Sequence, residues 1–188
     1  MIIRWGVVLG MLVLISGCAT DSNDSYFRNT DTSANVYVAP AARRIQKVAI
    51  LPFKGPTELI GNSVSDMMVT EILRAGRYEL VERSQMGKVL NESEIALSGL
   101  SASKAAEVGN MIGADGVIIG TVDEYSTVAY RGDAIPVVGV SARLIDCSSG
   151  KVVWSVDLAE KADSRDATLP QHARKVVHEM ISAVYKAL

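Results

Sequence analysis

The order of apolar and polar residues divides the chain into three parts. Trp5 to Ser16 is a run without charged residues that follows Arg4. Ala19 to Arg44 is dominated by Ser, Thr, Asn, Asp and Ala, and shows no persistent helical or strand period. From Ile45 onward, regular periods continue to the end of the chain. We therefore expect one folded region behind an apolar start and a polar connecting segment.

Five segments of the third part have the patterns of strands. A continuous apolar run such as 47–53 (KVAILPF) is typical of a strand buried on both faces, whereas alternation indicates a strand with one solvent face. A tight turn at 148–150 (SSG) joins the last two strands as a hairpin. The predicted strands are 47–53, 78–82, 116–125, 137–146 and 151–158.

Helical periods fill the intervals between these strands. Ser, Asn and Gly stand where such helices would begin and end. The expected helices run from Asn62 or Ser63 to about Ala75, from Ser84 to about Leu97, and from Lys104 to Ile112 with Ser101 or Ser103 as cap. The last helix is the clearest, because its apolar residues recur at spacings of three and four. These residues are Ala173, Val176, Val177, Met180, Ile181, Val184 and Leu188.

The order of these elements, βαβααβββα, predicts a fold of the α/β class, arranged as an α+β sandwich. We expect a single small domain in which a mixed sheet of four or five strands is packed by three or four helices. The last of these helices is long and amphipathic, and it would cover one face of the sheet. No internal repeat is visible in the sequence.

The apolar start ends in Ile15-Ser16-Gly17-Cys18. Its twelve uncharged residues suit the central region of a secretory signal and are too few to span a bilayer as a helix. Small residues directly before a cysteine resemble the lipobox of bacterial lipoproteins. That resemblance implies cleavage between Gly17 and Cys18 and lipidation of Cys18, with two or three acyl chains giving a stable anchor. An ordinary signal peptide with a coincidental cysteine, or a buried amino-terminal helix, is the alternative.

We therefore predict a lipoprotein signal peptide over 1–17, a lipid anchor and flexible tether over 18–44, and the domain over 45–188. Four larger side chains interrupt the polar tether, and they would either stay in solvent or dock on the domain or a partner. They are Tyr26, Phe27, Val36 and Tyr37. Residue 19 is Ala rather than Asp, which in lipoproteins of enteric type implies sorting to the outer membrane. The domain would then face the periplasm.

Charge and cysteine content narrow the possible partners. Of 19 basic and 21 acidic residues, only Arg4 would be lost with the signal peptide, so the remaining charge is close to neutral. Such a balance provides no basic surface for nucleic acid, and we expect none to bind. Lipidation of Cys18 would leave Cys147 alone, as a small, half-buried residue. Without lipidation, a Cys18–Cys147 disulfide becomes possible.

The residues that most often carry chemistry are poorly placed for it. His172 and His178 are six apart on the last helix, so they fall on different faces, and we expect both to face solvent. Asp123 and Glu124 are neighbours on a strand and would point to opposite faces. Arg131-Gly132-Asp133 is expected to form a hairpin tip. We predict no catalytic residue, no metal or cofactor and no small-molecule substrate, hence a protein that is not an enzyme.

Several segments together resemble the CsgG family of curli secretion and assembly lipoproteins. They are VAILPF at 48–53, RYELVERSQMGKVLNE at 77–92, GADGVIIGTVDEY at 113–125 and SARLIDCSSGKVVWS at 141–155. They occur in the order of the family. The resemblance implies a small α/β unit used for protein contacts, which can associate with copies of itself within an envelope export or assembly system.

The sequence also departs from the pore-forming members of that family. Each of their subunits supplies two membrane-crossing hairpins, and such strands need about 9–11 residues of alternating polarity. The first position, Tyr125 to Val140, is interrupted by Asp133 and Pro136, and the second, Asp157 to Leu169, is highly charged. We therefore expect a membrane-held assembly component, with a LpoB-type activator of a peptidoglycan synthase as the alternative. A secretion pore is less favoured, and an unrecognised enzyme less still.

Overall fold

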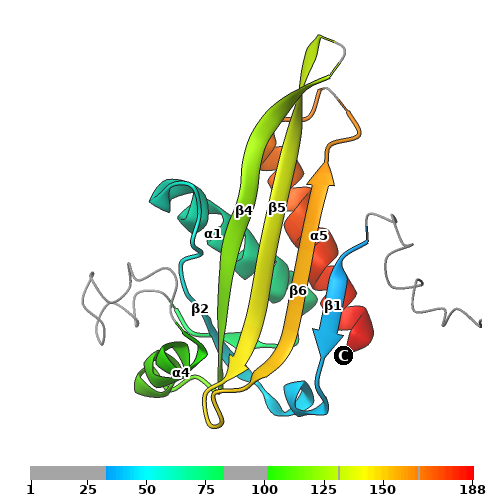
Figure 1. Ribbon diagram of the computed structural model, residues 1–188. Coiled ribbons are helices and arrows are strands. Elements are labelled where there is room, and N and C mark those ends of the chain that lie inside the picture. Colours follow the sequence, from blue (N-terminus) through cyan, green and yellow to red (C-terminus); the bar gives the residue numbers. More distant parts are fainter. Residues whose placement is uncertain (1–32, 83–100, 131, 165) are drawn as a thin grey trace, which may run out of the picture. The chain divides into compact units, whose positions relative to one another are not determined.

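Six strands form one mixed sheet in a computed structural model that describes residues 33–82, 101–130, 132–164 and 166–188 (Figure 1). The strand order across the sheet is β1-β6-β5-β4-β2-β3. The strands are β1 (Asn35–Val38), β2 (Lys47–Ile50), β3 (Glu79–Leu80), β4 (Gly116–Tyr130), β5 (Asp133–Asp146) and β6 (Val152–Lys161). Strands β1 and β6, β6 and β5, and β5 and β4 pair antiparallel, whereas β2 pairs parallel with β4 and with β3.

Three α-helices and a short 3-10 helix complete the described part of the chain. They are α1 (Glu58–Ala75), α4 (Ala102–Met111), α5 (Leu169–Ala187) and the 3-10 helix η2 (Pro40–Arg44). Helix α1 begins earlier than Asn62, because the Thr57 hydroxyl accepts a hydrogen bond from the Ile60 amide at 3.2 Å and caps it there. It ends at Gly76, in the left-handed conformation (φ 68°). Helix α5 starts with a capping box between Thr168 and Gln171.

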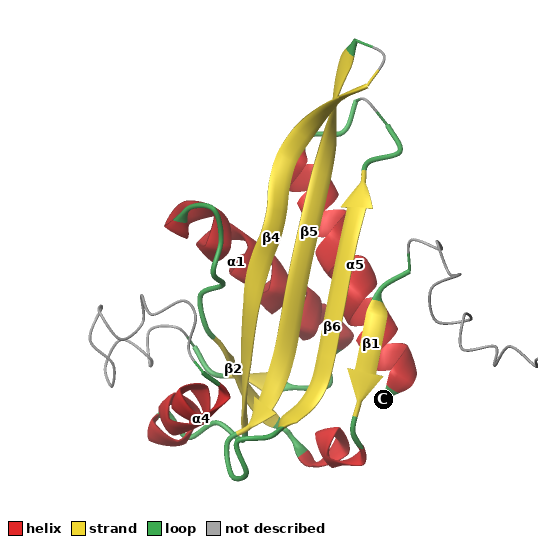
Figure 2. Ribbon diagram, in the orientation of Figure 1, coloured by secondary structure: helices red, strands yellow, loops and turns green. Residues whose placement is uncertain are grey.

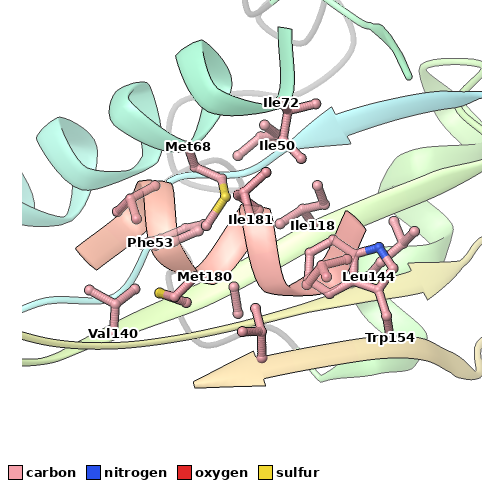
Figure 3. Close-up of a cluster of buried hydrophobic side chains, with 14 of the residues drawn as sticks. Ile50, Phe53, Met68, Ile72, Ile118, Val140, Leu144, Trp154, Met180 and Ile181 are labelled. Carbon is pink, nitrogen blue, oxygen red and sulfur yellow. The ribbon is translucent and has the colours of Figure 1, made fainter. Parts of the chain in front are cut away.

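Helices α1 and α5 cover one face of the sheet, which we call the covered face. Figure 3 shows its interior, where Trp154 and Leu144 of neighbouring strands lie against α5. The large side chains of this core are almost fully buried, and they include Phe53, Met68, Ile72, Ile118, Leu144, Trp154 and Met180. Burial of such side chains contributes about 1.5–3 kcal/mol each relative to exposure, so this layer supplies most of the stability of the fold.

A second, smaller core lies on the opposite side of the sheet. Val117 and Ile119 of β4 and Ile145 of β5 pack there with Ala105 and Val108 of α4. Helix α4 is short and packs mainly against β4 and β5. Beyond α4, no described helix covers this side of the sheet, and in Figure 2 the strands lie in front with α1 and α5 behind them.

The predicted α/β class, the mixed sheet and the long carboxy-terminal helix are confirmed. The sheet has six strands rather than four or five, because residues 35–38, which we assigned to the tether, pair with β6 as strand β1. Val36 and Val38 pack against the main core and Ala42 is fully buried, so the folded region begins before Ile45. The helix predicted from Ser84 to Leu97 lies outside the described residues.

Candidate functional site

Among the described helices only α4 packs on the side of β1, β6, β5 and β4 that faces away from α1 and α5. We call the part of this side that α4 leaves uncovered the open face. Its outward side chains follow from the strand register, since directly paired residues lie on the same side of the sheet. Apart from the residues that α4 covers, they are Asn35 and Tyr37 of β1, Ser155, Asp157, Ala159 and Lys161 of β6, Asp133, Ile135, Val137, Gly139, Ser141 and Arg143 of β5, and Thr121, Glu124, Ser126, Val128 and Tyr130 of β4.

Short side chains lie next to Gly139 near the middle of the open face, and aromatic rings lie at its two ends. A Cβ atom on Gly139 would lie 3.2 Å from the Cβ of Glu124 and 3.4 Å from that of Ala159, so the side chains here are close and short. Tyr37 is exposed at one end, and Tyr130 is exposed at the other, where the ammonium of Lys161 lies 4.8 Å from its ring centroid. An exposed tyrosine therefore lies at each end of the open face.

Hydrogen bonds engage the carboxylates of Asp157 and Glu124 on the open face. The Asp157 carboxylate accepts from Asn35 Nδ2 at 3.0 Å, and the Glu124 carboxylate accepts from the Ser126 hydroxyl. Arg143 is exposed, and within the described part of the chain no ion pair is found for it. Its guanidinium is therefore available for a carboxylate from outside the domain.

The hairpin of β4 and β5 reaches past β6. Strand β5 pairs with β6 as far as Val137, and the Ala162 amide still donates to the Pro136 carbonyl at 2.8 Å, so the three residues 133–135 pair with β4 alone. Gly132 turns the hairpin with φ 89°, and Tyr130 pairs with Asp133 across it. The predicted hairpin tip is confirmed, and Val128 and Tyr130 leave apolar surface exposed on the part of the hairpin past β6.

His172 does not face solvent as predicted; only 3% of it is exposed. Its Nε2 lies 2.9 Å from the backbone oxygen of Glu160, at the stretch of β6 that β1 does not reach. The helical period placed His172 off the apolar stripe, because it could not show that α5 packs against the end of β6 there. His172 therefore has a structural role, because this buried contact holds α5 to the end of β6.

An ion cluster stands beside this contact. Lys175 Nζ lies 2.5 Å from Glu160 Oε1 and 3.4 Å from Asp163 Oδ2. The hydrogen bond to Glu160 raises the pKa of Lys175 above its ordinary value, although burial opposes the shift. The lysine thus stays charged and holds the end of β6 to α5.

His178 is partly exposed, as expected for the second histidine, and bridges two helices. Its Nδ1 lies 2.8 Å from Glu71 Oε2, and Arg74 binds the other oxygen of the same carboxylate at 2.9 Å. The Glu71 side chain is buried between α1 and α5, and a groove beside it is lined by Ala75, Ile181 and Tyr185 among others. The carboxylate is fully engaged by these two partners, which identifies the group as a clamp between helices.

Cys147 is buried rather than half-buried. Burial raises the pKa of its thiol to about 11, and the nearby carboxylates of Asp146 and Asp115 add to the shift. The thiol is therefore protonated and unreactive at neutral pH. Its sulfur also explains Gly109 of α4, where a Cβ atom would lie 2.2 Å from Sγ.

The remaining chemical candidates stay apart. A bulge between Val122 and Glu124 shifts the register of β4, and both Asp123 and Glu124 are exposed there. No group of three or more His, Cys, Asp or Glu side chains suited to a metal ion is found in the described ranges. None of the helices described has the length and apolar character needed to cross a membrane. Gly17 and Cys18 lie outside the described residues, so cleavage and lipidation stay predictions.

Known structures share this architecture. A PelC subunit from Paraburkholderia phytofirmans, solved as a dodecamer, is 26% identical, with a TM-score of 0.58 over 80% of this chain and 94% of that one. The lipoprotein GNA1162 from Neisseria meningitidis is 19% identical, with a TM-score of 0.52 over 76% and 96% of the two chains. The LpoB C-terminal domain from Salmonella enterica is 15% identical, with a TM-score of 0.47 over 61% and 82%. No curated protein sequence matches the chain.

The family assignment rests on the sequence profile of the "curli production assembly/transport component CsgG". That profile matches residues 43–171, a range that begins within η2 and ends in the first turn of α5. It therefore includes β2 to β6 and both helices that lie between β2 and β5 in the described chain. Since the match extends over more than half of the 188 residues, the chain belongs to the CsgG family.

Proposed function

We propose that the protein is a lipid-anchored component of a bacterial envelope export or assembly system, held in the outer membrane through Cys18 with its domain in the periplasm. It acts without catalysis, by associating with copies of itself and with another envelope protein. The observation that carries the proposal is the CsgG family match over residues 43–171. That family is described by its part in curli assembly and transport, which is work done through protein contacts.

Self-association has separate support from PelC. The PelC chain that was solved as a dodecamer is matched over 94% of its length, so the whole of its subunit has a counterpart here. The open face supplies a broad surface on which contact with another chain is possible, since no described helix covers it. Homo-oligomers of this kind require such a surface in every subunit.

The anchor has separate support from the sequence. Small Ser16 and Gly17 precede Cys18 after an apolar run of signal-peptide length. The lipoprotein GNA1162 shares the fold of the domain. This likeness is consistent with a lipid anchor but gives no evidence on Cys18 itself. The positions of Gly17 as the last residue of the signal and Cys18 as the lipidated residue are therefore part of the proposal.

Two measurements on the full chain test the proposal. The protein purified from membranes in mild detergent should have a protein mass that is a multiple of one chain, measured by light scattering with the detergent subtracted. A single-chain mass at all concentrations would overturn self-association. In parallel, mass spectrometry of the amino-terminal peptide should find acyl groups on Cys18.

Cys18→Ser is the matched variant for the anchor. It should move the protein from the membrane fraction to the soluble fraction, and the partition of a second lipoprotein serves as control. Retention of the Cys18→Ser variant in membranes would contradict the anchor and leave self-association untouched. Crosslinking in membranes, followed by identification of the attached proteins, then tests the partner. Recovery of a transpeptidase or glycosyltransferase in place of an export component would favour the synthase-activator alternative.

A further inference from the structure

We propose that the open face of one copy receives the outer side of helix α1 from a second copy, so that subunits join head to tail. The inference deepens the self-association in the proposed function and rests on it. Three features of the described domain support it: a second stripe on α1, a match in length and a pair of charges.

Helix α1 carries a second stripe on the side away from the core. Its inner side packs Val64, Met68 and Ile72 into the covered face. The outer stripe consists of Leu59, Ser63, Asp66, Thr70 and Leu73, all of them exposed and spaced by three and four residues. Leu59 is 78% exposed and Leu73 is 56% exposed, although both are large apolar residues. A helix with leucines on its solvent side is suited to a second packing partner.

The two surfaces have nearly the same length. Leu59 and Leu73 are fourteen residues apart, which corresponds to about 21 Å along a helix. On the open face, Ser155 pairs with Tyr37 at one end, and Lys161 lies against the ring of Tyr130 at the other. These two positions are six residues apart on β6, which corresponds to about 20 Å along a strand. Leu59 and Leu73 can therefore lie over Ser155 and Lys161 of β6 at the same time.

One pair of charges completes the match. Glu58 stands beside Leu59 in the first turn of α1, exposed and without an ion pair among the residues described. Arg143 is exposed near the Tyr37 end of the open face. It pairs with Ser155 of β6, and Ser155 pairs in turn with Tyr37 of β1. Placing Leu59 at Tyr37 would bring the two charges together across the contact.

The position of these surfaces determines the kind of assembly. Helix α1 packs on the covered face, so its outer stripe and the open face lie on opposite sides of the sheet. Contact between two different surfaces is heterologous, and each copy keeps one free surface for a further copy. Such contacts produce closed rings of more than two subunits when the rotation closes, which is consistent with the twelve chains of the PelC structure.

Cysteine pairs test the orientation of the contact in membranes that contain the full chain. Asp66→Cys lies at the midpoint of the outer stripe, and Ala159→Cys lies near the middle of the open face. With a short bis-maleimide, a chain that carries both substitutions should give a ladder of dimers, trimers and larger species. A mixture of the two single variants should stop at dimers. Native Cys147 is buried and protonated, so the wild type serves as the unreactive control.

Failure of the contact can be separated from failure of self-association. Dimers from Ala159→Cys alone would indicate two open faces against each other and overturn the inference. An oligomer of unchanged mass with no crosslink in the double variant would also overturn it, while self-association would stand. A single-chain mass for the wild type would instead refute self-association itself.

Charged substitutions on the outer stripe give a second test. Leu59→Arg together with Leu73→Arg should reduce the oligomer to single chains, since both leucines are already exposed in the subunit and should fold normally. Met111→Arg is the matched control, because Met111 of α4 is 57% exposed but belongs to neither surface. An unchanged mass for the Leu59→Arg and Leu73→Arg variant, confirmed as folded by circular dichroism, would contradict the inference.

Discussion

The two faces of the same sheet differ in every property that governs packing. On the covered face, β6 presents Trp154, Val156 and Leu158, which are buried under α5. The alternate residues of the same strand, Ser155, Asp157 and Ala159, lie on the open face and are short, polar or charged. The same strand therefore stabilises the domain with one side and offers a contact surface with the other. Substitutions on the two faces should separate unfolding free energy from assembly.

The largest expected contrast is between neighbouring residues of β6. Trp154→Ala should lower the free energy of unfolding by about 3–5 kcal/mol, because the indole is fully buried and its removal leaves a cavity. Ser155→Ala, on the open face, should change it by no more than about 0.5 kcal/mol. Chemical denaturation monitored by circular dichroism measures both. Equal losses for the two variants would refute the division of roles between the faces.

Two glycines provide the next contrast. A Cβ atom on Gly120 would lie 2.6 Å from the Phe53 ring and 2.7 Å from the backbone oxygen of Ser141, so Gly120→Ala should cost about 1–3 kcal/mol. Gly139→Ala should be far milder, since its nearest contacts would be 3.2 Å or longer. The difference in urea midpoint between the two variants measures the effect. A larger loss for Gly139→Ala would mean that the open face is the more tightly packed one.

The next contrast concerns the contact between His172 of α5 and the end of β6. His172→Ala removes the hydrogen bond to the Glu160 carbonyl and should lower stability by about 1–2 kcal/mol. Arg174→Ala, at an exposed position on the same helix, is the control and should stay within about 0.5 kcal/mol. Hydrogen exchange at the end of β6 should increase only in the His172 variant. Unchanged exchange there would show that His172 does not hold the edge.

The smallest effect is expected at the turn between β5 and β6. Burial alone would raise the pKa of Asp146, but hydrogen bonds from Ser148 and Ser149 outweigh it and lower the pKa below its ordinary value. The stabilisation is therefore present at neutral pH and is lost as the pH falls through the lowered pKa. Asp146→Asn should cost about 1 kcal/mol at pH 7.

The pH dependence supplies the control for this turn. The difference in unfolding free energy between the wild type and Asp146→Asn should shrink as the pH falls below about 4, where the unfolded carboxyl is protonated. A difference that is constant from pH 7 to pH 3 would mean that the charge of Asp146 does not contribute. Either outcome leaves the two faces of the sheet unaffected, because the turn belongs to neither.

Residues with a strong local signal were predicted well from the sequence. The stripe from Ala173 to Val184 is buried along its whole length, and the turn at Ser148 joins β5 to β6 as expected. The assignment of Asn35 to Val38 to the tether was wrong. These residues lie in a polar stretch of sequence, and only their pairing with β6 makes them a strand. The prediction that His172 faces solvent was wrong for a related reason. Its partner is the Glu160 carbonyl of β6, which belongs to a different element.

The open face was predicted only in part. Alternation along 137–146 and 151–158 showed that one side of each strand would be apolar, but not that the other side would lack a helix. The outer stripe of α1 has only two leucines, which a sequence pattern assigns to solvent as readily as to a partner. Its significance appears only when the length of the open face is known from the strand register.

Strand β1 gives the domain a mechanical property. It is the first strand of the fold, so tension applied to the chain before Asn35 reaches the domain through its four pairs with β6. Asn35 and its hydrogen bond to Asp157 bear the strain first. Detachment of β1 would lengthen the extended chain by about 14 Å, while the pairs between β4, β5 and β6 remain. The domain thus has an extensible first segment that can yield under load before its core does.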